Sequence, residues 1–146
     1  QGRAAFERSK LNHCLAGRTP HRLLRKFYQE LIRLRGTLPL PGCVKDGKMK
    51  VCASQTDRVL LVEYSKGSRR AVLIFNYSRE PAEASVALAT GCWRKRLDSA
   101  SASWGGPGSE VRGEARCNGR LKLKLAAWSA VVLERARPAP QARPAR

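Results

Sequence analysis

The sequence predicts a mainly β fold, an antiparallel β-sandwich preceded by one long amphipathic α-helix. Residues 19–36 repeat their apolar side chains at the helical period, whereas residues 49–134 hold short β-type segments separated by turn residues. The chain has 146 residues, of which 42% are hydrophobic and 27% charged. This composition is typical of one modest folded domain and excludes wholesale disorder.

The first eighteen residues are of mixed composition and carry no sustained hydrophobic period. The sequence opens on Gln1, and Met49 is its only methionine, so we expect a piece of a longer protein. No apolar run reaches the ~20 residues that cross a bilayer, and residues 1–10 lack the apolar core of a secretion signal. We therefore expect no membrane association.

Residues 19–36 have the boundaries of an amphipathic helix. Thr19 is a suitable N-cap, Pro20 suits the first helical position, and Gly36 is a typical helix end. The apolar arc covers about half of the circumference, wider than the ~100° that one contact surface needs. We therefore expect the helix to contact more than one layer of protein. The apolar residues of the arc are Leu23, Leu24, Phe27, Tyr28, Leu31, Ile32 and Leu34.

Arg35 falls inside this apolar arc. An unpaired guanidinium is costly to remove from water, so we expect Arg35 to meet a carboxylate or backbone carbonyl groups. Anion binding is the functional alternative for this residue.

After a Gly/Pro-rich joint at residues 37–48, the period changes from 3.6 to 2. The runs VLLV (59–62) and AVLIF (71–75) are continuously apolar and predict interior strands, whereas LKLKL (121–125) places Lys122 and Lys124 on a solvated face. Short strands at this spacing predict a sandwich domain over residues 49–134. The expected strands are 49–53, 58–64, 70–77, 83–88, 93–97, 111–117, 121–125 and 130–134.

Two segments near the C-terminus have distinct local signals. Asn118-Gly119 can supply the two positive φ angles of a type I′ turn, so we expect a hairpin between strands 111–117 and 121–125. Residues 135–146 form an Arg/Pro/Ala tract with little to bury, and we expect a disordered tail.

The sequence offers little catalytic chemistry. Its eleven acidic residues are spread singly, and its two histidines, His13 and His21, lie in or just before the expected helix. We therefore expect no catalytic residue and no cofactor. The cysteines, at positions 14, 43, 52, 92 and 117, form no CxxC pair, so we expect reduced, buried thiols and no metal site.

Trp104 is the one candidate substrate-binding residue. It opens the Gly-rich stretch 104–108, where its ring could stack on the apolar face of a sugar. The structural alternative, which we favour, is a ring that fills the end of the sandwich or contacts a neighbouring domain. Trp93 and Trp128 lie at strand positions, and we expect both in the core.

The formal charge of +18 raises the alternative of a nucleic-acid-binding β domain. Basic residues are spread along the whole chain, and only 6% of the residues are aromatic. Binding of nucleic acid by stacking needs aromatic side chains among the basic ones, so this alternative is less favoured.

Two segments resemble the end of the catalytic barrel in the α-amylase superfamily of glycoside hydrolases, most closely the malto-oligosyltrehalose trehalohydrolases. In the loop QGRAAFERSKLNH the matching residues are Gln1, Phe6, Glu7, Arg8, Ser9, Lys10 and Leu11. In the helix HRLLRKFYQELIRLRG they are Leu23, Leu24, Tyr28, Leu31, Ile32, Leu34 and Arg35. His13 and Gly36 depart from the family pattern, at positions that carry an aromatic residue and an arginine there.

The resemblance extends to the family's C-terminal β-sandwich through VLLVEYSKGSRRAVLIFNYS, LDSASASWGGPG and AAWSAVVLE. It implies that residues 1–18 are a barrel-end loop, that residues 19–36 are the last helix of a missing (β/α)8 barrel, and that this barrel is the partner of the chain. The catalytic carboxylates of the family lie in that barrel, so this segment alone is expected to be inactive.

The implied parent enzyme hydrolyses the α-1,4-glucosidic bond next to a terminal trehalose unit, in trehalose biosynthesis in the cytoplasm, without a cofactor. The alternatives are the C-terminal domain of a glucan-branching enzyme or an α-glucosidase, and a stand-alone α-glucan-binding module whose ligands are maltooligosaccharides.

Overall fold

The computed structural model describes residues 2–39, 48–54 and 58–136, and its N-terminal part is helical. Helix α1 (Arg3–Ser9) and the short 3-10 helix η1 (His13–Gly17) precede the long helix α2 (His21–Thr37). The expectation of a loop over residues 1–18 is therefore wrong for these two segments. Neither α1 nor η1 buries a residue, so neither needs the apolar period by which a helix is recognised in a sequence.

The expected boundaries of the long helix also need correction. Pro20, not Thr19, occupies the N-cap position, and its carbonyl accepts the N–H groups of Leu23 and Leu24. Gly36 does not end the helix, because Thr37 continues it and the N–H of Leu38 still bonds to the carbonyl of Leu34. The helix is thus longer at its C-terminus than its composition indicates.

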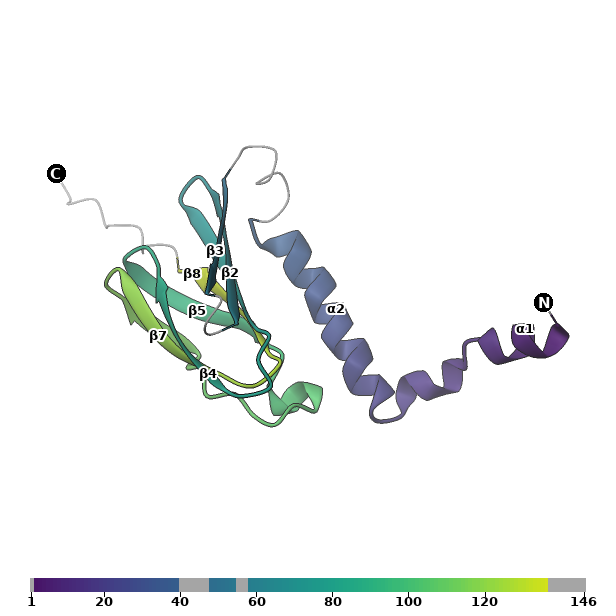
Figure 1. The fold of residues 1–146 in the computed structure, drawn as a ribbon. Coiled ribbons are helices and arrows are strands. Elements are labelled where there is room, and N and C mark those ends of the chain that lie inside the picture. The colour runs from purple at the N-terminus through teal and green to yellow at the C-terminus, as the bar shows by residue number, and fades with distance from the viewer. Residues whose placement is uncertain (1, 40–47, 55–57, 137–146) are drawn as a thin grey trace.

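Within the described residues, eight antiparallel strands form two stacked sheets (Figure 1), which confirms the predicted sandwich. The six-stranded sheet has the order β1-β2-β3-β8-β5-β6, and the two-stranded sheet pairs β4 with β7. The apolar runs of β2 and β3 lie in the interior of the larger sheet, as expected. The strands are β1 (Met49–Ser54), β2 (Val59–Lys66), β3 (Arg69–Asn76), β4 (Ala82–Ala87), β5 (Gly91–Asp98), β6 (Glu114–Cys117), β7 (Arg120–Leu125) and β8 (Ala130–Arg135).

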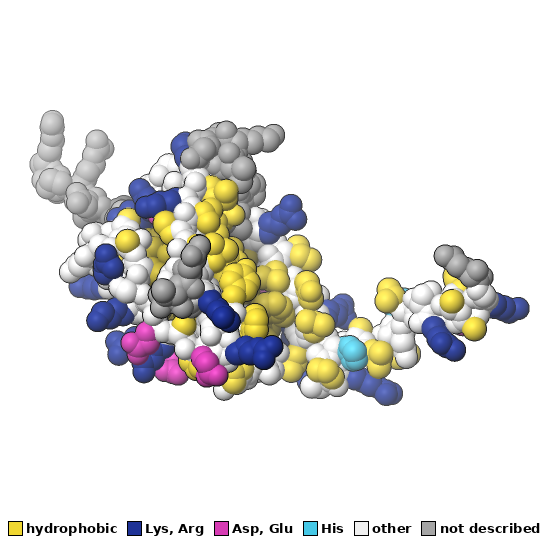
Figure 2. All heavy atoms as spheres, viewed as in Figure 1, with side chains coloured by type: hydrophobic (Ala, Val, Ile, Leu, Met, Phe, Trp, Pro, Cys, Tyr) yellow, Lys and Arg dark blue, Asp and Glu magenta, His cyan; other side chains and the backbone are white. Residues whose placement is uncertain are grey.

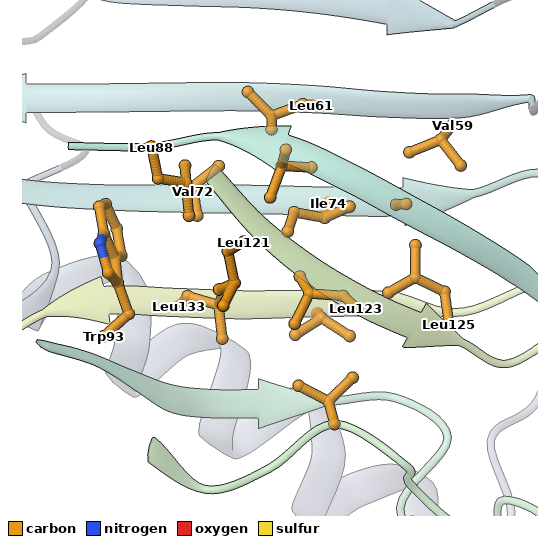
Figure 3. Packing of buried hydrophobic residues seen from close by; sticks show 14 of the residues in the cluster. Val59, Leu61, Val72, Ile74, Leu88, Trp93, Leu121, Leu123, Leu125 and Leu133 are labelled. Carbon is orange, nitrogen blue, oxygen red and sulfur yellow. The ribbon is translucent and has the colours of Figure 1, made fainter. Parts of the chain in front are cut away.

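The main core lies between the two sheets (Figure 3). Trp93 is 1% exposed, and its indole Nε1 donates a hydrogen bond of 2.9 Å to the carbonyl of Ala89, so its polar atom is satisfied inside the core. Strand β7 alternates as predicted, with its leucines buried and Lys122 and Lys124 exposed. The core residues are drawn from both sheets and include Val59, Leu61, Val72, Ile74, Val86, Leu121, Leu123, Leu125 and Val131.

Asn118 and Gly119 do not form the predicted hairpin. Strand β6 belongs to the six-stranded sheet and β7 to the two-stranded sheet, so the turn carries the chain from one layer to the other. Only Gly119 has a positive φ, of 91°, whereas a type I′ turn needs two. Cys117 and Leu121 on either side are both buried, which places one strand in each wall of the core.

Helix α2 forms a third layer on the outer face of the six-stranded sheet. Leu34 and Leu38 are buried there against three sheet residues, Ala71 of β3, Leu97 of β5 and Val132 of β8. Phe27, Leu31 and Leu73 pack against this second cluster and are half-buried. In the described residues, no helix is long and apolar enough to cross a membrane.

Two of the predicted segments fall largely on residues that the structure does not describe. Residues 40–47 of the expected joint lie outside the described residues, and so do residues 137–146 of the expected tail. Arg135, which the prediction assigns to the tail, is the last residue of β8.

Candidate functional site

The loop that carries Trp104 is fixed at its base by a buried carboxylate at the end of β5. Asp98 is 4% exposed, and its Oδ1 accepts the N–H of Ala100 at 2.9 Å, while its Oδ2 accepts the hydroxyl of Ser109. Lys95 donates from Nζ to the same Ser109 Oγ at 2.7 Å. The two ends of the loop, residues 99 and 109, are thereby held together.

The glycines of the loop allow a close backbone approach. The N–H of Gly106 donates to the carbonyl of Ser101 at 3.1 Å, and that of Gly108 donates to the carbonyl of Ala100 at 2.8 Å. A Cβ atom on Gly106 would overlap the carbonyl oxygen of Ala100. Gly105 has a φ of 82°, a conformation that favours glycine. The Gly-rich stretch therefore has a structural reason for its composition.

Trp104 ends a short 3-10 helix, η2 (Ala102–Trp104), and contacts helix α2. Its ring meets the ring of Phe27 edge to face, with centroids 5.6 Å apart and an interplanar angle of 63°. A Cβ atom on Gly105 would lie 3.3 Å from Cδ1 of Leu23, one turn earlier in the helix. The loop thus supports the N-terminal half of α2. Sugar binding by Trp104, which is half-buried, stays a prediction.

Trp128 is not in the core, and that expectation is wrong. It lies in the turn between β7 and β8 with a φ of 49°, and it is 63% exposed. Asn76, a buried side chain that the sequence interpretation missed, fixes this turn by donating from Nδ2 to the carbonyl of Ala126 at 2.8 Å. The N–H of Trp128 donates to the carbonyl of Ser78 at 3.0 Å, so the fixed backbone directs the indole outward.

The apolar arc of α2 is divided between two environments. Leu34 is buried against the sheet, whereas Leu24, Tyr28 and Ile32 are 53%, 58% and 71% exposed. The sheet therefore covers only one side of the arc. Arg35 lies one turn beyond Ile32, is exposed and pairs with no carboxylate among the described residues, so the expected partner of Arg35 is absent from this part of the chain.

Nine large apolar side chains of the described residues are exposed, and we refer to them together as the apolar face. Figure 2 shows hydrophobic side chains along the N-terminal helices and on the part of the sandwich beside α2. The nine exposed side chains occupy α1, the segment after it, α2, the outer side of β1, and the ends of β3 and β8, whereas β4 and β7 carry none of them. The ring of Tyr77 stacks on that of Phe75 at 5.9 Å, which extends the face past β3. The residues are Phe6, Leu11, Leu24, Tyr28, Ile32, Met49, Val51, Tyr77 and Trp128.

Register explains why β1 belongs to the apolar face. Met49 and Val51 pair with Tyr64 and Val62 of β2, which point to the same side of the sheet as Ala71 of β3. Ala71 packs against α2, so the outer side of β1 and the helix lie on one surface of the sheet.

Titratable groups of α2 are mainly solvated. A hydrogen bond from Arg33 lowers the pKa of the Glu30 carboxyl below its usual value, against a smaller opposing effect of burial. The positive charge of Arg96 in β5 also lowers the pKa of Glu30, by a smaller amount.

The exposure of the cysteines differs from the expectation of buried thiols. Cys117 is buried, but Cys14 and Cys52 are exposed, so the expectation of buried thiols is wrong for those two. Cys43 lies outside the described residues. The described residues contain no group of three or more His, Cys, Asp or Glu side chains that could hold a metal ion.

No protein-family model and no curated protein matches the sequence. Solved structures are similar to about three quarters of the chain. Trehalulose synthase MutB from Pseudomonas mesoacidophila MX-45 is 20% identical with a TM-score of 0.50, over 75% of this chain and 17% of the other. A GH30 endoxylanase from Clostridium papyrosolvens C71 is 12% identical with a TM-score of 0.52, over 74% and 27%. An α-amylase from H. orenii is 19% identical with a TM-score of 0.49, over 75% and 20%.

The likenesses to trehalulose synthase MutB and to the endoxylanase show the fold. The chain spans about 17% to 27% of the length of the enzymes whose structures it matches. The fold of this chain therefore also occurs as one part of larger enzymes.

Proposed function

We propose that the chain is the non-catalytic β-sandwich segment of a glycoside hydrolase of the α-amylase superfamily, and that it braces the catalytic barrel through helix α2. The apolar face carries this proposal. Soluble monomers rarely expose contiguous apolar patches larger than a few hundred Å², and such patches mark surfaces that bind other protein. Here the patch includes three side chains of the helix that the sequence resemblance assigns to the end of a barrel, Leu24, Tyr28 and Ile32.

The energy available from such docking is substantial. Leu24, Tyr28 and Ile32 each retain more than half of their surface for burial. Full burial of a large apolar side chain contributes roughly 1.5–3 kcal/mol, so each of these three can still contribute about 1 kcal/mol or more. The polar outer side of β4 and β7 offers no comparable gain, so in this proposal the barrel docks on the apolar face.

The finer proposal is that the parent is a malto-oligosyltrehalose trehalohydrolase, acting in the cytoplasm on the α-1,4-glucosidic bond beside a terminal trehalose unit, without a cofactor. Its support is the match of residues 1–11 and 23–35 to the family's barrel-end loop and helix. A glucan-branching enzyme and an α-glucosidase share the superfamily fold and stay alternatives for the parent.

The test begins with the genomic reading frame before the codon for Gln1. We expect it to continue upstream through a barrel of about 250 residues or more, and we expect the long product to release trehalose from maltooligosyl trehalose. Branch formation in amylose, or glucose release from maltose, would identify one of the alternatives. A stop codon directly upstream, or trehalose release by the purified 146-residue chain alone, would contradict the proposal.

A second candidate, a stand-alone α-glucan-binding module, is favoured by one observation. Trp128 presents more than half of its surface on a fixed turn, and aromatic rings can stack on sugars. Calorimetry with maltoheptaose tests it. Heat of binding that is lost in Trp128→Ala or Trp104→Ala would support the module. Absence of heat with the unsubstituted 146-residue chain would exclude it.

A further inference from the structure

Four arginines surround a recess at one end of the six-stranded sheet. The recess has a volume of about 370 Å³, and the described residues that line it are Arg69, Arg94, Arg96, Glu134, Arg135 and Ala136. These side chains come from β3, β5 and β8, which are adjacent in the sheet although up to 66 positions separate them in the sequence. The fold, not the sequence, therefore gathers this charge.

Each arginine lies beside an oxygen atom in or near the recess, as a hydrogen-bond donor or in an ion pair. Arg69 donates from Nη2 to Glu134 Oε1 at 3.1 Å and to the carbonyl of Thr37 at the end of α2. Nε of Arg96 lies 3.7 Å from Glu134 Oε2.

The other two arginines also lie beside oxygen atoms. Nε of Arg94 lies 2.7 Å from Glu114 Oε1, and Arg135 donates from Nη2 to the carbonyl of Thr90 at 2.6 Å. A guanidinium has five N–H donors, so each arginine keeps several that bond to nothing else in the described part of the chain.

Two backbone features place these side chains. A Cβ atom on Gly91 would lie 2.8 Å from Nε of Arg135, so the glycine leaves room for this guanidinium beside β5. Among the described residues, this Nε is buried and has no hydrogen-bond partner. The pairing of β5 with β8 shifts register between Lys95 and Leu97, which makes Arg96 the extra residue of a bulge. Bulges often lie beside functional sites, where they redirect one side chain.

The charge of the recess is unbalanced. Its lining carries four positive groups and one carboxylate, Glu134, which leaves an excess of three positive charges. Arg94 interacts with one further carboxylate, Glu114, at the rim. Arg69, Arg94 and Arg96 have side chains that are 35%, 58% and 32% exposed, so a dissolved anion can reach them. Like charges this close repel one another, and a multivalent anion relieves the repulsion.

We propose that this recess binds the phosphate group of a small phosphorylated molecule, such as a sugar phosphate. A phosphate monoester carries close to two negative charges and three acceptor oxygens, which match several planar guanidinium groups at once. A single carboxylate offers less charge and fewer acceptors. Nucleic acid would instead need a longer basic stripe with exposed aromatic side chains, and the recess is a single concave site.

The test is calorimetric titration of the 146-residue chain with inorganic phosphate and then with glucose 6-phosphate, at constant ionic strength set by chloride. We expect saturable binding of one anion per chain. Arg94→Ala and Arg96→Ala should each weaken it about tenfold or more, because a hydrogen bond between charged groups is lost. Arg120→Ala, an exposed arginine on β7 outside the recess, is the matched control and should bind as the parent does.

Arg96→Lys keeps the charge but not the planar fork, and should bind more weakly than the parent but more tightly than Arg96→Ala. Circular dichroism of each variant shows whether it is folded, and Arg94→Ala is the safest because that side chain is the most exposed of the three. Absence of saturable phosphate binding overturns the proposal. Two other results overturn it as well: phosphate binding that is weakened equally by Arg120→Ala, and binding of duplex DNA but not of phosphate. Both would indicate that the basic residues act as a general surface charge and not as one site.

Discussion

Replacing Trp104 by alanine should separate helix α2 from the loop that supports it. The edge-to-face contact with Phe27 contributes about 0.5–1.5 kcal/mol beyond burial. Removing a fully buried aromatic side chain costs about 3–5 kcal/mol, and Trp104 is only half-buried. Together these values predict a loss of about 2 kcal/mol in the free energy of unfolding.

Urea denaturation followed by far-ultraviolet circular dichroism measures this loss, with the midpoint lowered and the slope unchanged. Trp128→Ala is the matched control. It removes the same side chain from an exposed position and should change the free energy of unfolding by less than about 0.5 kcal/mol.

A double-mutant cycle with Phe27→Leu and Trp104→Leu isolates the contact itself, and we expect a coupling of about 1 kcal/mol. The reasoning is refuted if Trp104→Ala unfolds at the same urea concentration as the parent chain, or if the coupling is zero.

Three further predictions concern the loop, the core and the helix. Gly106→Ala should lower the free energy of unfolding by about 2 kcal/mol through overlap with the backbone, whereas Gly113→Ala, which has open space around it, should leave the urea midpoint nearly unchanged. Asn76→Ala leaves buried carbonyl groups without a donor and should cost about 3 kcal/mol in the same assay. Arg33 lowers the pKa of Glu30 in the folded state, so the stability from this carboxylate is present above its usual pKa of 4.5 and is lost as the pH falls below it. Glu30→Gln should lack this part of the pH dependence, as thermal melting at pH 7 and pH 3 would show.

The strands could be predicted because their burial is periodic along the chain. Strand β7 shows this most clearly, since every second side chain is a buried leucine and the lysines between them are solvated. Helix α1 was missed because it buries nothing and therefore leaves no period in the sequence. The prediction of a hairpin at Asn118 was wrong because β7 pairs with β4 and not with β6. This pairing places Lys124 opposite Glu83, which is distant in the sequence.

The site was harder to predict, since its residues meet only through the fold. Trp104 and Trp128 have similar local sequences of small residues, yet one contacts Phe27 and the other is exposed. The two tryptophans differ because Asn76, at the end of β3, bonds to the turn before Trp128 and fixes its backbone. The only sequence signal for Asn76 was a polar residue that ends an apolar strand.

The central claim is that the apolar face is covered by another folded domain. Sedimentation velocity of the 146-residue chain, read together with the fluorescence of a hydrophobic dye, tests it most directly. We expect self-association or dye binding in the parent chain, and a dye-free monomer when Leu24, Tyr28 and Ile32 are all replaced by glutamine. A parent chain that is already a monodisperse monomer without bound dye would contradict the claim.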